Sequence, residues 1–301
     1  MAIMSTGSHP KALWGQVKGW FGKFYNEHAS EYPELFEIEN SNMNFEEDVQ
    51  ITGLGLAPVK DQGGSVSYSA MKQGWVKRYS HVVYGLGYIV TREAIEDNQY
   101  SKVSKSHAKA LAFAMHQTKE NVAANVYNRA FTSGYTGGDG SVLCVTSHTT
   151  RTGSQSNALA TAADLSEASI EDMAIMIMDA TDDEGLNISL MPKKLIVPTE
   201  LVFEAERILQ STLRPDSANN DVNALKSMGI IPKVVANHYL TDADAWFVRT
   251  NAVDGMKMYQ RRALEFGKDN DFDTENAKAK ATERYSVGWT DWRGCYGTPG
   301  A

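Results

Sequence analysis

Residues 101–131, with the sequence SKVSKSHAKALAFAMHQTKENVAANVYNRAF, decide the fold of this chain. The stretch contains neither glycine nor proline, alanine is frequent in it, and Ser101 can cap its amino end, so local propensity favours a helix. A helix of this length spans roughly 45 Å, about three times the average. Apolar residues recur at helical spacing, which predicts one buried stripe with charged residues on the faces between. The stripe is Val103, Leu111, Met115, Val122, Val126 and Ala130, and the charges are Lys105, Lys109, Lys119 and Glu120.

Composition limits the function classes. The chain has 301 residues, 29 basic and 37 acidic, and a formal net charge of -8. This charge repels phosphate and argues against sequence-specific DNA binding. No apolar run reaches the roughly 18 residues that span a bilayer, and no signal peptide is recognisable, so we expect a cytosolic protein without a membrane segment. Cys144 and Cys295 lack CxxC spacing, which predicts two free thiols.

The amino-terminal stretch contains an amphipathic segment with lysines nearby. Such a segment can lie on a membrane. Because no second membrane signal follows, we predict an arm whose aromatic face packs on its own chain or on a neighbour. The residues of this face are Leu13, Val17, Trp20, Phe21, Phe24 and Tyr25.

Between Phe45 and Thr91 the period changes to that of strands, and glycine and proline mark turns. We expect a first limb from about Val49 to Val59, a turn at 60–64, and a return limb that continues to Val90. An isolated pair of strands is marginal in water. Since apolar residues lie on both faces of the pair, something outside the hairpin should cover it, and a neighbouring subunit would do.

From residue 164 helical patterns alternate with short buried strands, and a strand-like pattern returns after Gly255. The predicted fold class is α+β. The expected elements are a helix capped by Ser169, a strand at 195–197, a helix at 201–213, and strands at 233–236 and 245–249. A short helix at 92–97 and an extended crossing at 132–160 flank the long helix.

No catalytic or metal-binding pattern emerges. Asp269, Asp271 and Asp273 have the spacing that opens an EF-hand loop, but Thr274 stands where glycine is needed and Lys280 where glutamate is needed. The sequence has no HExxH, GxSxG or Walker motif. We therefore expect no catalytic residue, metal or cofactor. A soluble enzyme is disfavoured, because it would need a convergent polar pocket.

Several short segments surround the long helix in a definite order: TREAIEDN at 91–98, Ser147-His148 with SNALAT at 156–161, and LIVP at 195–198 with AERIL at 205–209. In this order they resemble stretches of tailed-bacteriophage major capsid proteins, particularly the group that includes the Mu-like major head subunit. The resemblance runs from about Phe45 to the carboxyl end. It rests on the order of the segments, since no single motif is diagnostic.

The resemblance implies the Johnson fold of phage major capsid proteins. This fold combines an N-terminal arm, an extended β-hairpin loop, a long spine helix, a peripheral domain and an axial α/β domain. The implied boundaries are 1–44 for the arm, 45–91 for the hairpin loop, 92–163 with 252–301 for the peripheral domain, and 164–251 for the axial domain.

The resemblance also implies a function, that of a major capsid protein made in the host bacterial cytoplasm. Hexamers and pentamers of the chain would form an icosahedral shell that encloses double-stranded DNA without reading its sequence. A separate scaffolding protein, decoration proteins and a portal at one vertex are the implied partners. Covalent cross-linking through Lys60 or Lys72 is not expected, because lysine is common in exposed turns. The alternative is a cellular encapsulin-like nanocompartment with the same fold, which would hold a protein cargo.

Two groups of residues are expected at contacts between subunits. The first follows a glycine in the return limb and contains the residue types that dominate interface hot spots, although its tryptophan could pack on its own chain instead. The second lies in a polar loop that the family places near the symmetry axis of each capsomer, where the loop contacts its own copies. The hairpin residues are Trp75, Arg78 and Tyr79, and the loop residues are Arg214, Asp216 and Asp221.

Overall fold

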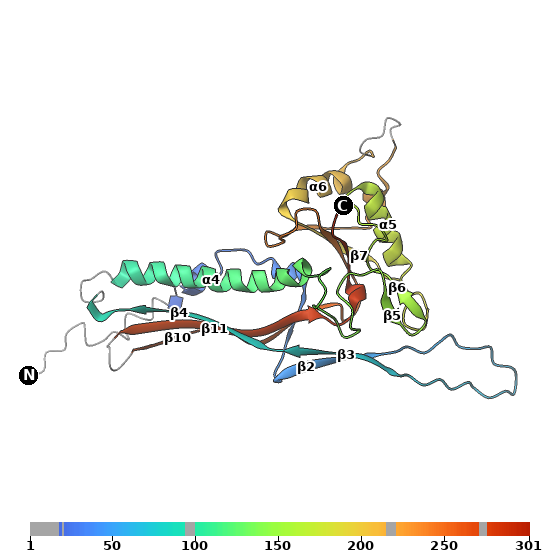
Figure 1. Ribbon diagram of the computed structural model, residues 1–301, viewed down its shortest axis with the longest axis horizontal. Coiled ribbons are helices and arrows are strands. Elements are labelled where there is room, and N and C mark those ends of the chain that lie inside the picture. The colour runs from blue at the N-terminus through green and yellow to red at the C-terminus, as the bar shows by residue number, and fades with distance from the viewer. Residues whose placement is uncertain (1–17, 20, 94–99, 215–220, 271–275) are drawn as a thin grey trace, which may run out of the picture.

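The computed structural model describes residues 18–19, 21–93, 100–214, 221–270 and 276–301. It has an elongated part and a compact part (Figure 1). In the elongated part, the long helix α4 (Tyr100–Asn128) lies along a four-stranded sheet of order β1-β10-β11-β4. The compact part stands at one end of this rod and is built on a second four-stranded sheet, of order β12-β9-β7-β8.

The bounds of the elements follow from the backbone hydrogen bonds. The first sheet contains β1 (Glu37–Asn40), β10 (Met256–Asn270), β11 (Ala277–Trp289) and β4 (Val82–Val90). The second contains β12 (Cys295–Thr298), β9 (Trp246–Thr250), β7 (Pro192–Val197) and β8 (Val234–Ala236). Besides α4, the helices with described bounds are α2 (Tyr32–Leu35), α5 (Glu167–Met178), α6 (Val202–Gln210) and α7 (Ala224–Met228), with single turns η2 (Thr199–Leu201) and η3 (Trp292–Gly294). Two hairpins complete the fold, β2 (Phe45–Ile51) with β3 (Gln73–Ser80) and β5 (His148–Thr150) with β6 (Gly153–Gln155).

The predicted spine helix is confirmed as α4, but Ser101 lies inside it rather than capping it, and it ends at Asn128 rather than Phe131. Its apolar stripe packs on the first part of β11, where the small side chains of Ala277, Ala279 and Ala281 let the helix approach the sheet closely. Leu111 and Met115 of the stripe are buried. The side chain of Val103 lies outside the described residues, as does most of the short helix expected at 92–97.

Two charged residues of α4 are buried, contrary to the prediction that they lie on exposed faces. Lys119 pairs with Glu283 of β11 at 2.5 Å between Nζ and Oε1. The carboxylate of Glu120 accepts the backbone N–H groups of Glu31 and Tyr32, each at 2.9 Å. The sequence does indicate that Lys119 is buried, because this residue falls on the apolar stripe, four residues after Met115 and three before Val122.

We predict that the Glu120 carboxyl makes stability depend on pH. Burial raises its pKa from 4.5 to about 7, so the folded chain binds this proton more tightly than the unfolded chain does. The free energy of unfolding should therefore fall as the pH rises from 4.5 to 7, by up to about 3 kcal/mol from this group. Urea unfolding of the native chain and of Glu120→Gln across this range measures the effect. A pH profile that is the same for both proteins would contradict it.

The predicted hairpin is shorter than expected, because its return limb divides between two sheets. β2 pairs with β3 between Phe45 and Ser80, whereas β4 pairs with β11 over its whole length. The prediction that residues 82–90 face the first limb is therefore wrong. Polar His81 marks the break, and its ring bonds Ser41 and Ser286 rather than continuing a strand.

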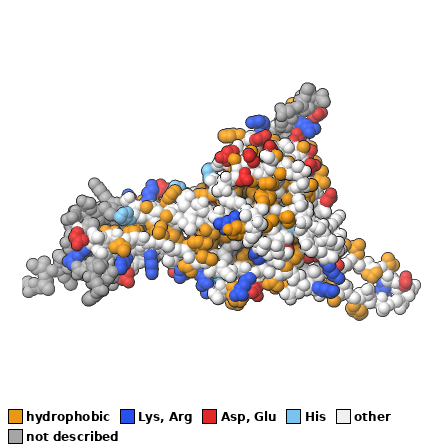
Figure 2. All heavy atoms as spheres, viewed as in Figure 1, with side chains coloured by type: hydrophobic (Ala, Val, Ile, Leu, Met, Phe, Trp, Pro, Cys, Tyr) orange, Lys and Arg blue, Asp and Glu red, His pale blue; other side chains and the backbone are white. Residues whose placement is uncertain are grey.

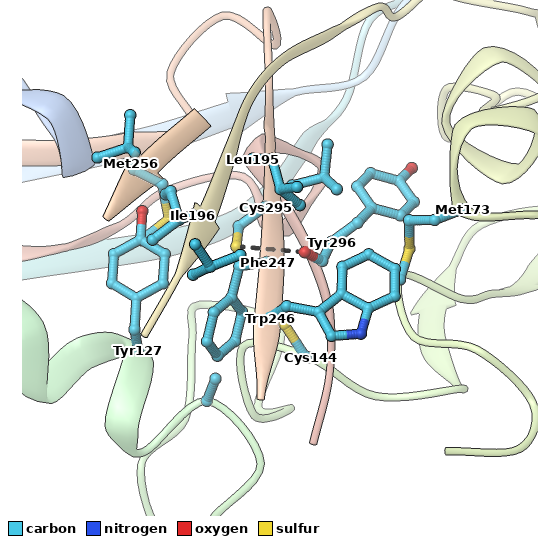
Figure 3. Close-up of a cluster of buried hydrophobic side chains, with 14 of the residues drawn as sticks. Tyr127, Cys144, Met173, Leu195, Ile196, Trp246, Phe247, Met256, Cys295 and Tyr296 are labelled. Atoms are coloured by element: carbon cyan, nitrogen blue, oxygen red, sulfur yellow. Dashed lines mark hydrogen bonds between the residues drawn. The ribbon is translucent and has the colours of Figure 1, made fainter. Parts of the chain in front are cut away.

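The main core lies at the junction of the two parts and continues into the compact part (Figure 3). Trp246 and Phe247 of β9 are buried there, and the ring of Tyr127 from α4 meets Phe247 edge-on with centroids 5.2 Å apart. Both cysteines, Cys144 and Cys295, are buried and free, as predicted.

Local rules explain the helices of the compact part. Helix α5 begins three residues earlier than predicted, because Ser166 is the N-cap and Ser169 closes the capping box from position N3. The second helix ends at Gln210 rather than 213. The strands expected in this region and after Gly255 are confirmed with small shifts in their ends.

Within the extended stretch predicted at 132–160, the segments around His148 and Asn157 form a buried cluster of hydrogen-bonded polar side chains. The His148 ring bonds Asp139 at 2.6 Å and Asn157 at 3.0 Å, and it stacks on the indole of Trp292 with centroids 4.2 Å apart. The Asn157 amide donates to the carbonyls of Leu143 and Cys295. This histidine therefore has a structural role.

Charge is divided unevenly between the parts. Residues 164–251 contain fifteen acidic and seven basic residues, a net charge of -8, and the rest of the chain contains twenty-two of each. Acidic side chains accordingly gather over the compact part in Figure 2, whereas basic ones lie along the elongated part. The whole net charge of the chain therefore belongs to one segment.

The described end of the amino-terminal arm packs on its own chain, which is one of the two predicted outcomes. Phe21 is buried against Leu111, Met115 and Ala281, with Phe24 and Tyr25 beside it. Leu13, Val17 and Trp20 lie outside the described residues, as do Asp271 and Asp273. Among the helices described here, none has the length and apolar character needed to cross a membrane.

Candidate assembly surfaces

The base of the β2–β3 hairpin is attached to its own chain. The hydroxyl of Tyr79 lies 2.7 Å from Oγ1 of Thr290, and its ring meets Tyr259 edge-on with centroids 5.0 Å apart. The indole N–H of Trp75 donates to the Thr290 carbonyl at 3.3 Å, and its ring packs against the main core. Asp48 of β2 accepts the Thr290 hydroxyl at 2.5 Å. These contacts fix the direction of the hairpin within the subunit.

The three hairpin residues expected at a subunit contact therefore differ in what they expose. Tyr79 is 3% exposed and Trp75 is partly buried, so most of both side chains is used inside the subunit. Arg78 is exposed, with its guanidinium 3.7 Å from the centre of the Phe45 ring and 3.8 Å from Glu47. Whether any of them contacts a neighbour stays a prediction, and Arg78 has the surface for it.

A long loop projects from this base at residues 52–72 (Figure 1). The N–H of Thr52 donates to the Lys72 carbonyl at 2.9 Å, so the two ends of the loop lie side by side. Between these ends apolar side chains stand in solvent: Leu56 is 82%, Val59 95% and Tyr68 94% exposed. Exposed apolar groups gathered on one projecting segment are typical of surfaces that another protein covers.

Leu213 and Val222 of the compact part are joined by a β-bridge. The Arg214 N–H donates to the Asp221 carbonyl at 2.9 Å, and the Arg214 guanidinium bonds Glu167 of its own chain at 3.0 Å. Asp216 lies outside the described residues. The predicted contact of loop 213–222 with other copies stays a prediction.

Arg293 holds the junction together and was not predicted. It is 2% exposed and donates to Asp183 at 3.0 Å and to the Thr181 carbonyl at 2.9 Å. The other carboxylate oxygen of Asp183 accepts the Gln50 amide of β2 at 2.5 Å. A chain of bonds thus runs from the hairpin base to the compact part. The sequence offers no signal for this connection, because Gln50, Asp183 and Arg293 are far apart in the chain.

The described residues contain no group of three or more histidine, cysteine or carboxylate side chains that could hold a metal ion. The buried charged side chains between the long helix and its sheet, Lys119, Glu120 and Glu283, bond one another or the backbone in the interior. Lys119 and Glu283 also border a pocket with Phe21, Tyr25 and Tyr32, but they bond each other there. The features that call for a partner are therefore surfaces, above all the exposed loop 52–72.

Sequence comparison gives one family. The model of the family described as "Phage capsid protein" matches residues 76–297. No curated protein matches the chain in sequence.

Solved structures with the same fold come from several sources. The capsid of the cyanophage P-SCSP1u matches with a TM-score of 0.56 at 12% identity, over 91% of this chain and 88% of that one. The capsid of Myoviridae phage XM1 matches with 0.54 at 9% identity, over 92% and 97%. A virus-like particle from Pyrococcus furiosus matches with 0.53 at 8% identity, over 95% and 99%. At these identities the likeness shows the fold alone, and it confirms the predicted fold class.

Proposed function

Because the chain belongs to the phage capsid protein family, we propose that it is the major head protein of a tailed double-stranded DNA phage and assembles as hexamers and pentamers into an icosahedral shell. Its family is a structural one and not a family of enzymes. Within the family we place it in the group that includes the Mu-like major head subunit, on the order of its sequence segments. The genome would be enclosed without sequence-specific contacts.

One observation carries this proposal. Loop 52–72 exposes apolar side chains although the base beside it is attached to its own subunit. A free subunit would keep this apolar surface in water, so a second copy is the natural cover. The compact part then takes the place of the axial domain, with loop 213–222 toward the symmetry axis. A separate scaffolding protein would guide assembly, and decoration and portal proteins would complete the head.

Electron microscopy of the purified chain tests the proposal. Closed or partial shells built from six- and five-membered rings would support it, and subunit contacts within about 4 Å of Arg214 and Asp221 would support the axial placement. A chain that stays monomeric at all concentrations would contradict it. Particles filled with one specific host protein would favour the encapsulin-like alternative. The fold shared with the Pyrococcus furiosus particle does not favour that alternative over a phage head.

The charge of the compact part makes a further prediction for assembly. If residues 164–251 meet around an axis, each copy brings a net charge of -8 to the ring. Salt shortens the range of this repulsion, to about 10 Å at 0.1 M. We therefore expect light scattering to show faster assembly of purified subunits as NaCl is raised from low to physiological concentration. Assembly that slows with salt would mean that attraction between opposite charges dominates the contacts instead.

A further inference from the structure

A short acidic segment crosses the junction between the two parts of the subunit. It runs from Glu31 through α2 to Glu37, the first residue of β1, and it carries a glutamate at every third position. We call residues 31–37 the strap. On one side of the strap lies helix α4 of the elongated part, and on the other lies the sheet of the compact part.

The strap is attached to the elongated part mainly through its backbone. Glu120 of α4 accepts the N–H groups of Glu31 and Tyr32 at 2.9 Å. The hydroxyl of Tyr127, also in α4, donates to the Leu35 carbonyl at 2.9 Å. Strand β1 then joins the edge of the first sheet by pairing with β10. The strap therefore moves with the elongated part.

The acidic side chains of the strap bond the compact part. Glu34 lies 2.7 Å from Nζ of both Lys194 and Lys233, and these two partners lower its pKa to about 2. The Glu31 carboxylate bonds the His238 ring at 2.5 Å, and Glu37 lies 3.0 Å from the buried guanidinium of Arg249. Three glutamates thus meet cationic or polar groups on β7, β9 and the segments that flank β8.

These ion pairs and hydrogen bonds constrain the orientation of the two parts, which the apolar contacts at the junction do not. Leu35 and Phe36 enter the main core beside Tyr127, and apolar contact of this kind is not directional. Ion pairs and hydrogen bonds need particular distances and angles. Glu34 bonds two lysines at once, one in β7 and one before β8, so it resists rotation of the compact part better than a single bond would.

We propose that the strap is a clamp that sets the angle between the elongated and compact parts, with Glu34 as its main positioning residue. If the proposed function holds, this angle also decides the curvature with which subunits meet. A variant in which the strap no longer holds this angle would then form shells of mixed diameter rather than no shells.

Distance measurement on unassembled subunits tests the clamp. Spin labels at Asn121→Cys on α4 and Ser227→Cys on α7 report the separation of the two parts by double electron–electron resonance. Both positions are exposed, and the native cysteines are buried away from the label. Glu34→Gln removes the charge and keeps the size of the side chain. We expect the distance distribution to widen by about twofold in this variant.

The matched control is Glu27→Gln. Glu27 also lies in the amino-terminal arm and pairs with a lysine, but this partner is Lys109 of α4, at 3.8 Å, so the pair stays within the elongated part. Its distribution should equal that of the parent protein. If both variants widen it equally, the effect is not specific to the junction and the clamp is wrong.

Lys233→Gln is a second variant for the same measurement if Glu34→Gln does not fold. This lysine side chain is half exposed, so its replacement should leave the fold intact while removing one of the two Glu34 partners. A widened distribution supports the clamp, and an unchanged one in folded Lys233→Gln and Glu34→Gln overturns it. Failure of the parent protein to form shells would overturn the proposed function but leave the distance result standing.

Discussion

Replacement of Lys119 by alanine should lower the free energy of unfolding by about 3–5 kcal/mol, because it leaves Glu283 buried without its cation. Glu283 has one carboxylate oxygen 2.5 Å from Lys119 Nζ and 3.0 Å from the Gln260 amide. Both members of the ion pair are almost completely buried, so water cannot replace the lost partner. Urea unfolding of the purified subunit measures the change.

Lys109→Ala is the matched control for this experiment. Lys109 lies on the same helix and also faces a glutamate, but the pair is exposed and its atoms are 3.8 Å apart. Its loss should cost less than about 1 kcal/mol. The double variant with Met at both 119 and 283 should recover much of the stability, since it removes both charges together. Equal losses in the two single variants would show that burial does not strengthen the Lys119 pair.

Shortening of the exposed loop should abolish shell formation and leave the subunit folded. Thr52 and Lys72 are already hydrogen-bonded, so an Asn-Gly turn can join Gly53 to Met71 in place of residues 54–70. The free energy of unfolding should change by less than about 1 kcal/mol, because the deleted residues are exposed and loop closure depends weakly on length. The yield of closed shells should fall more than about tenfold, since each copy loses a contact of hot-spot size.

Val253→Ser is the control for the loop deletion. Val253 is about as exposed as Leu56 of the loop but lies in a turn before β10. Particle counts by electron microscopy and melting curves should be collected on both proteins. Normal shells from the shortened chain would show that loop 52–72 is not needed for assembly, and an unfolded subunit would show that the loop belongs to the core.

Local patterns predicted the elements better than their partners. The helix at 101–131, the exposed turn of the hairpin and the α/β alternation after residue 164 follow from periodicity, caps and glycine punctuation, which act over a few residues. The pairing of β4 with β11 joins residues about two hundred positions apart. Nothing in the sequence near Val82 distinguishes this partner from the first hairpin limb.

The candidate surfaces show the same limit. Residue type marked Trp75 and Tyr79 as side chains with much apolar surface to bury, but interface and core favour the same aromatic residues. Only the position of Thr290 shows that Trp75 and Tyr79 bond their own subunit. Sequence reasoning could not identify Glu283 as the partner of Lys119 or Asp183 as the partner of Arg293, because each partner comes from another element.

The order of the strands along the chain also has a consequence for synthesis. β10, β11 and β12 all lie between residues 256 and 298, and they supply two inner strands of one sheet and an edge of the other. A ribosome that has completed the spine helix and residues 164–251 has therefore still not made the strands that either sheet needs to close. Folding waits for this last stretch, and so does the attachment of the hairpin base to Thr290. Nascent chains on the same messenger RNA would therefore be unable to assemble with one another until their synthesis is complete.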